Sequence, residues 1–173
     1  MIGVRIPSMS NLINFNIDTL SKILFTIETL ESVWSRKNKN FNNETIGRHI
    51  RHIIDFYLCF IGHIDSNFID YDARKRSAKI ESDISFARYK IEEIIYFLKN
   101  TDLVDKNIKV RMNSSVYNLD LNSSIFRELM HIADHAIHHA NLVQVIIKNE
   151  FPDLERNCNF YSPSTIDSKR CAQ

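Results

Sequence analysis

Histidines are concentrated in one stretch of this chain, and their spacing is suited to metal binding. Four of the seven histidines, His131, His135, His138 and His139, lie within positions 131–139. An α-helix turns by about 100° per residue, so His135 and His139 are expected nearly above one another on one helix face. Two imidazoles at this spacing can bind one metal ion, as in helical zinc sites. They supply only two ligands, so a third must come from another segment.

His49 and His52 are the obvious source of that third ligand. They belong to an expected helix over residues 45–64, whose apolar side chains recur at threes and fours. Both histidines lie on one flank of the apolar face, where a side chain can point toward a neighbouring helix without being lost in the core. The spacing alone leaves open which of the two takes part.

These histidines could also have roles other than binding a single metal ion. They could form a polar seam inside a helical protein or a solvent-facing cluster, and His63 alone is typical of a packed, hydrogen-bonded core residue. Ferritin-like di-iron sites require Glu-x-x-His on two helices, but Glu128-Leu-Met-His131 has no second copy. The zincin pattern His-Glu-x-x-His requires Glu where Ala136 stands. A site for one ion with three histidine ligands therefore fits the pattern better than either of these metal motifs.

Three acidic residues near the histidines are candidates for catalytic roles. Asp55, Glu128 and Asp134 could orient the ligand imidazoles or act as a general base. The alternative for each of them is a solvated acid on a helix surface.

The charge of the chain is nearly balanced, which argues against nucleic acid as a partner. The formal net charge is +1, and the only basic cluster we single out, residues 74–76, is short. Arg48, Arg51 and Arg127 could meet an anionic substrate, or they could form ordinary surface salt bridges.

Composition predicts a helical protein of one domain in a reducing compartment. A length of 173 residues suits a single domain, 1–173, and three Gly and three Pro indicate long, uninterrupted helices. The cysteines Cys59, Cys158 and Cys171 form no Cys-x-x-Cys pair and are typical of free thiols. The N-terminus lacks the apolar core of a signal sequence, and no apolar run approaches the roughly 20 residues of a membrane span. We therefore expect a cytoplasmic protein with no membrane partner.

Periodicity divides the chain into four helices and one hairpin. Apolar residues at helical spacing predict helices over residues 10–35, 45–64, 77–98 and 124–149. Between residues 104 and 121 the apolar residues alternate around a turn, which predicts a small β-hairpin. The expected fold is all-α: an antiparallel four-helix bundle with this hairpin between its third and fourth helices and an irregular C-terminal tail.

Several motifs resemble those of the DinB-like (DinB/YfiT-like) proteins. His135-Ala-Ile-His-His139 is similar to their late His-x-x-His-His signature, and the segment 45–52 is similar to the helix that carries their first metal ligand. Three shorter stretches are also similar to one subgroup of the family: 71–76, 127–129 and 162–166. The motifs are short, but their order and spacing extend from the second helix to the tail. Ala140-Asn141 departs from the Arg-Gly that many members carry after the doublet.

The resemblance implies a four-helix bundle with a three-histidine site for a divalent metal, commonly zinc or nickel. Carried over to this chain, the ligands are His52, His135 and His139, with His49 as the alternative to His52. Some members of the family resemble transferases that conjugate low-molecular-weight thiols, and others are described as hydrolases.

Two functions from different classes follow. The first is a metal-dependent enzyme, a thiol transferase or hydrolase acting on a small molecule, because three histidines leave coordination positions open. A low-molecular-weight thiol is then a candidate co-substrate. The second is a non-enzymatic binding module with a structural or vestigial metal site. A homodimer formed through an exposed helix face suits either function.

Overall fold

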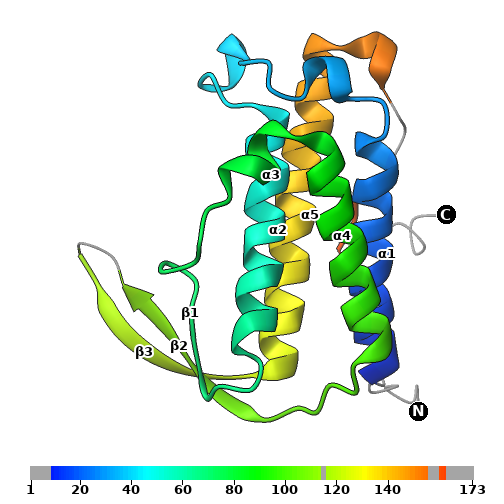
Figure 1. Cartoon of the computed structure of the whole chain (residues 1–173). Coiled ribbons are helices and arrows are strands. Elements are labelled where there is room, and N and C mark those ends of the chain that lie inside the picture. The colour runs from blue at the N-terminus through cyan, green and yellow to red at the C-terminus, as the bar shows by residue number, and fades with distance from the viewer. Residues whose placement is uncertain (1–8, 114–115, 156–159, 163–173) are drawn as a thin grey trace, which may run out of the picture.

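Four long helices form the main body of the described chain (Figure 1). The computed structural model describes residues 9–113, 116–155 and 160–162. Helix α1 (Met9–Ile27) contacts α4 (Ile84–Asn100) and α5 (Ile125–Glu150), and α2 (Ile46–His63) contacts the same two helices. Helices α2 and α5 are therefore direct neighbours, although more than 60 residues separate them in the sequence.

Side-chain caps begin the two helices that carry the histidines. The Thr45 hydroxyl accepts a hydrogen bond from the backbone N–H of Arg48 at 3.0 Å, and Ser124 accepts one from Arg127 at 3.3 Å. Such caps satisfy backbone donors that have no partner inside the first helical turn. The predicted starts of these helices agree with the structure to within a residue or so.

Two predicted helices are shorter than the periodicity suggested. Helix α1 ends at Ile27 and is followed by the short 3-10 helices η1 (Glu31–Val33) and η2 (Lys39–Phe41). The segment 77–98 contains two helices, α3 (Ala78–Ser82) and α4, because Asp83 adopts an extended backbone. The Asp83 carboxylate accepts a hydrogen bond from Phe86 N–H at 2.9 Å and so begins a new helix.

The predicted all-α fold class is wrong, because the described chain combines five α-helices with a three-stranded mixed sheet. Strand β1 (Phe68–Asp70) pairs in parallel with β2 (Asn107–Asn113), which pairs antiparallel with β3 (Asn118–Ser124). The arrangement is α+β. The alternation between 104 and 121 did indicate the β2–β3 pair. Strand β1 lies between the predicted helices 45–64 and 77–98, where the sequence indicated no strand, since three residues are too few to show a period of two.

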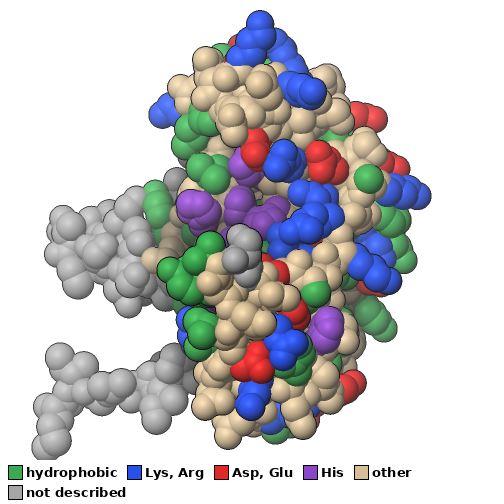
Figure 2. Space-filling model, turned by 90° about the vertical axis from the view of Figure 1, so that its left-hand side faces the viewer, with side chains coloured by type: hydrophobic (Ala, Val, Ile, Leu, Met, Phe, Trp, Pro, Cys, Tyr) green, Lys and Arg blue, Asp and Glu red, His purple; other side chains and the backbone are tan. Residues whose placement is uncertain are grey.

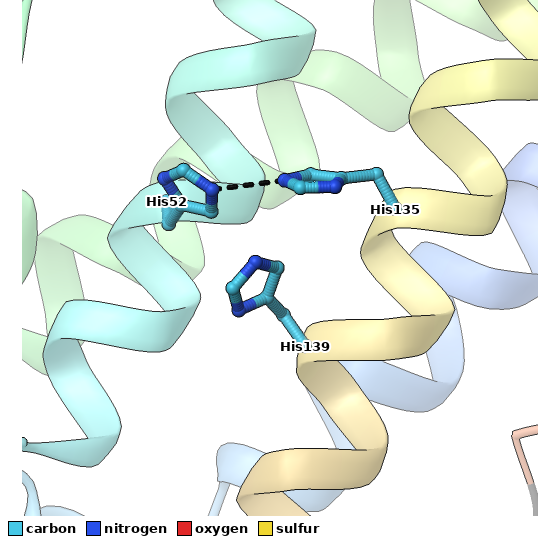
Figure 3. A group of neighbouring side chains, drawn as sticks. All are labelled: His52, His135 and His139. Atoms are coloured by element: carbon cyan, nitrogen blue, oxygen red, sulfur yellow. Dashed lines mark hydrogen bonds between the residues drawn. The ribbon is translucent and has the colours of Figure 1, made fainter.

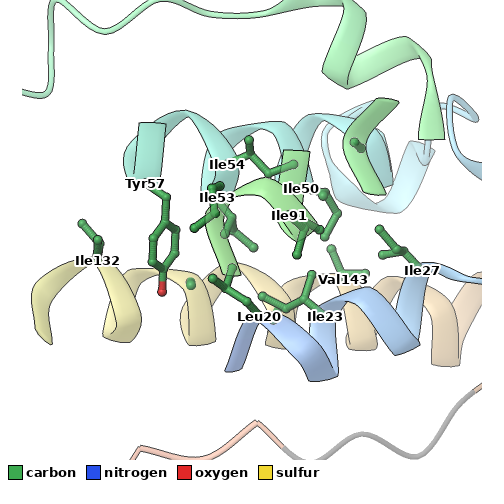
Figure 4. Close-up of a cluster of buried hydrophobic side chains, with 14 of the residues drawn as sticks. Leu20, Ile23, Ile27, Ile50, Ile53, Ile54, Tyr57, Ile91, Ile132 and Val143 are labelled. Atoms are coloured by element: carbon green, nitrogen blue, oxygen red, sulfur yellow. The ribbon is translucent and has the colours of Figure 1, made fainter. Parts of the chain in front are cut away.

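The apolar faces of the helices meet in one core (Figure 4). Leu20 and Ile23 of α1 lie opposite Ile53 of α2, and Ile132 and Val143 of α5 belong to the same cluster. The core also holds one buried polar link between helices: the Tyr57 hydroxyl donates a hydrogen bond to Asn16 Oδ1 at 2.8 Å. A buried hydroxyl is tolerated when it is paired in this way.

Two further expectations concern a membrane span and the C-terminal tail. None of the helices in the described part combines the length and apolarity needed to cross a lipid bilayer. The last short helix is η3 (Pro152–Leu154), and most of the predicted tail, with Cys158, Cys171 and the motif residues 163–166, lies outside the described residues.

The two glycines of α2 give opposite predictions for substitution by alanine. A Cβ on Gly47 would lie 2.7 Å from Trp34 Nε1 and closer still to the Glu81 carbonyl oxygen, whereas a Cβ on the exposed Gly62 would meet no atom within 4 Å. Gly47→Ala should therefore lower the free energy of unfolding by about 1–3 kcal/mol. Gly62→Ala should raise it by up to about 1 kcal/mol, because alanine favours the helix. Urea unfolding of both variants measures this, and equal effects would contradict the close packing of α2 on Trp34.

Candidate metal centre

Three histidines from two helices lie close together on one flank of the core (Figure 3). His52 projects from α2 toward His135 and His139 of α5. One ring nitrogen from each residue lies within 4.8 Å of the other two, and the Nε2 atoms of His52 and His135 are 2.8 Å apart. The predicted convergence of these three side chains is confirmed, and that they bind a metal stays a prediction.

The separations of the three histidine rings can be compared with the spacing of ligand nitrogens around a tetrahedral zinc ion. The ring centroids form a nearly equilateral triangle with sides of 4.9, 4.4 and 4.7 Å. Zn–N bonds of about 2.0–2.1 Å place tetrahedral ligand nitrogens about 3.3 Å apart. The one separation below that value is 2.8 Å, between Nε2 of His52 and Nε2 of His135, and all three ligand nitrogens lie within 4.8 Å of one another, so small side-chain rotations would bring them to it. The residues present therefore fit a divalent ion.

His49 is not part of this group, but it contacts one of its members. Its Nδ1 lies 3.2 Å from Nδ1 of His139, and its Nε2 lies 3.7 Å from a Glu44 carboxylate oxygen. A carboxylate only accepts hydrogen bonds, which favours a proton on Nε2 of His49. His49 then accepts from His139, so the His139 proton lies on Nδ1 and its Nε2 lone pair is free. That is the tautomer a metal ligand requires.

Arg74 has the opposite effect on His52. Its Nη2 lies 3.1 Å from Nδ1 of His52, and a guanidinium can only donate, so His52 accepts at Nδ1. The proton of the neutral His52 ring is then on Nε2, where it is shared with His135. An ion bound at Nε2 requires that proton to leave and Arg74 to release Nδ1, because ligating histidines normally donate their other N–H to an acceptor.

Burial keeps the three rings in the neutral form. Burial is the main cause that lowers the pKa of His52 to about 3, with further lowering by His135 and Arg74. Burial also lowers the pKa of His139 to about 3 and that of His135 to about 4, and neighbouring histidines add to both shifts. Neutral imidazoles present lone pairs, so no proton has to be displaced from a charged ring at neutral pH.

The acids proposed for catalysis occupy three different environments. Asp55 is buried, and its Oδ2 lies 3.9 Å from Arg51 Nε in a salt bridge. Glu128 is also buried, and it accepts a hydrogen bond from Ser123 in a pocket between the sheet and α5. Asp134 is exposed on α5. Their catalytic roles stay predictions.

The remaining histidines and Cys59 are not members of this group. His138 is exposed, and the His131 ring centroid is 6.1 Å from that of His135. His63 Nδ1 lies 2.8 Å from the Cys59 carbonyl oxygen, so its ring is hydrogen-bonded as expected, but the side chain is half-buried and lies outside the core. The Cys59 thiol donates to the Asp70 carbonyl, and burial raises its pKa to about 11, so it is protonated at neutral pH.

Comparison with known proteins adds no relative. No family model matches the sequence, and neither a curated protein nor a solved structure gives a match. Membership of the DinB-like proteins therefore stays a prediction.

Two residues that contact the histidines were missed in the sequence. Arg74 appeared only as part of a short basic cluster, and Glu44 was not singled out. Arg74 is 22 residues from His52 and Glu44 lies just before α2, so no helical spacing connects them with the histidines. The only sequence signal for that contact is that Glu44 is a carboxylate five residues before His49.

The lowered pKa values of the histidines predict that the free energy of unfolding falls as the pH is lowered. A histidine whose pKa is lower in the folded than in the unfolded chain costs stability as pH falls below its ordinary value of 6.5, down to the folded value. His139→Gln should therefore flatten the decline of unfolding free energy between pH 6.5 and about 3, by at most about 1 kcal/mol per pH unit because solvent screens a partly exposed ring. Urea unfolding in a chelating buffer measures the slope. The exposed His138→Gln is the control, and parallel wild-type and His139→Gln profiles would refute the prediction.

The contact of Arg74 with His52 predicts that removing this arginine strengthens metal binding. Arg74→Gln should raise the affinity for Zn²⁺ by about tenfold, because it removes a cation and replaces a donor at His52 Nδ1 by a group that can accept. Competition with a chromophoric chelator measures the dissociation constant. Arg76→Gln removes the same charge without that contact and should change the affinity by less. Weaker zinc binding by Arg74→Gln would show that the arginine supports the ligand instead of opposing it.

Proposed function

We propose that this protein is a metal-dependent enzyme that acts on a small molecule. His52, His135 and His139 would hold one divalent ion, with zinc and nickel as the expected metals. The observation that carries the proposal is the meeting of three neutral imidazoles from two helices, with their ligand nitrogens within 4.8 Å. The order of the DinB-like motifs supports the same assignment, and membership of that family is part of the proposal.

Three protein ligands are fewer than the four that closed structural zinc sites use. A bound ion with open positions supplies Lewis acidity, which can activate water or a thiol. The protein side chains have separate tasks around it. His49 orients His139, and the Phe56 ring packs 4.3 Å from that of His135 and shields it from water on one side.

Transferase and hydrolase chemistry remain the two forms of this proposal. A thiol transferase needs a thiol beside the ion, and Cys59 does not suit that role. Its thiol is protonated and lines a different pocket, with Leu58 and Ile80. The thiol would therefore come from a low-molecular-weight co-substrate. A hydrolase would need only water and one small-molecule substrate.

Metal binding is tested on untagged, chelator-treated protein. Titration with Zn²⁺ or Ni²⁺ should give one equivalent per chain. His52→Ala, His135→Ala and His139→Ala should each weaken binding by at least about 100-fold. His138→Ala is the matched control, because this histidine is exposed beside His139, and it should bind as the wild type does. A wild type that takes up no metal, or that binds equally well without His135, would refute the proposal.

A second experiment separates an enzyme from a binding module with a structural metal. Turnover of a nitrophenyl ester, or of cysteine with an electrophilic chlorodinitrobenzene, should require added metal and be lost in His135→Ala. The variant should keep a melting temperature close to that of the chelator-treated wild type. A large fall in melting temperature on metal removal, with no turnover in either assay, would instead support the structural site.

A further inference from the structure

A pocket of ≈ 310 Å³ opens directly beside the histidine group. His52 and His139 form part of its wall, and Arg74 and Arg76 form another part. Figure 2 shows histidines exposed on one face of the molecule with Lys and Arg side chains beside them. The volume is at the lower end of the range for small-molecule sites, so the pocket suits a compact ligand.

The pocket lining has an excess of positive charge. Four arginines line it, and Glu44 is its only carboxylate among the described residues. Glu44 lies 3.5 Å from Arg48, and Arg51 lies 3.2 Å from Glu81 outside the lining. These two arginines therefore have acidic partners of their own.

The other two arginines are not neutralised in this way. Within the described chain, neither Arg74 nor Arg76 forms an ion pair with a carboxylate. Arg76 is exposed at the pocket, whereas Arg74 is partly buried. Burial, and then repulsion by the charge of Arg76, lower the pKa of Arg74, while the more distant carboxylates of Asp55 and Asp72 act in the opposite direction. An anion between the two guanidinium groups would relieve that repulsion.

Arg74 is held in place before any ligand arrives. Its Nη1 donates to the Tyr71 carbonyl at 2.6 Å, and its guanidinium lies 4.6 Å from the Phe56 ring centroid. Its Nη2 reaches His52, while its buried Nε has no partner. A planar guanidinium is well suited to bind a carboxylate or phosphate, and its fixed position lowers the entropy cost of binding.

We propose that this pocket binds the substrate through an oxyanion, a carboxylate or phosphate group, held by Arg74 and Arg76 beside the three histidines. The substrate class is thus a small anionic molecule. Its reaction at the histidines rests on the proposed function, whereas binding of the anion needs only the arginines and can be tested without metal.

The test uses isothermal titration of chelator-treated, untagged protein at low ionic strength with inorganic phosphate, succinate and the neutral analogue succinamide. Phosphate or succinate should bind in the millimolar range or tighter, and succinamide should not bind. Arg74→Gln and Arg76→Gln should each weaken binding by about tenfold or more. Arg88→Gln on α4 removes the same charge away from this pocket and should stay within about twofold of the wild type.

The outcomes separate this proposal from the metal site. Loss of phosphate or succinate binding in the two pocket variants, with metal titration measured in parallel, supports the anion site whether or not zinc binds. Wild-type protein that binds neither oxyanion, or pocket variants that bind as tightly as the wild type, would overturn it. If Arg74→Gln does not fold by circular dichroism, the exposed Arg76→Gln carries the test alone.

Discussion

The packing of α2 against α5 is the constraint on which the candidate site depends. Ile53 and Tyr57 of α2 share one core with Ile132 and Val143 of α5, and the histidines project from the edge of this contact. A helix backbone is rigid, so the register between two packed helices determines where their flanking side chains meet. Rotating either helix by one residue, about 100°, would separate the rings. The apolar core therefore sets the geometry of a polar site.

The histidine group is costly for the protein to hold. Its imidazoles lose part of their contact with water, and this burial lowers the pKa values of His52, His135 and His139 and keeps the rings neutral. Partial burial of so many imidazoles together gives the fold little that apolar side chains would not give better. Such local conflicts between stability and polarity are typical of functional sites. This conflict favours a ligand-binding role over a mere polar seam.

The small sheet has a role in the site that its size does not suggest. Strand β1 anchors the connector between α2 and α3 against β2. The Asp70 carboxylate at its end accepts hydrogen bonds from the backbone N–H groups of Asp72 and Ala73, each at 3.0 Å. This turn leads directly to Arg74, which lies against Phe56 and His52. The part of the fold that contradicts the all-α prediction thus positions the arginine that most affects the histidines.

By itself, the sequence determined the helical histidine pair, the helix starts at Thr45 and Ser124, and the β2–β3 alternation. Each of these rests on contacts between residues close in the chain, such as a cap or a repeat of fixed period. Only the tertiary structure decided between His49 and His52 as the third member, since both lie on the same flank of α2. It also decided the pairing of β1, the break at Asp83 and the approach of Arg74. These depend on packing between segments far apart in the chain, which no local period records.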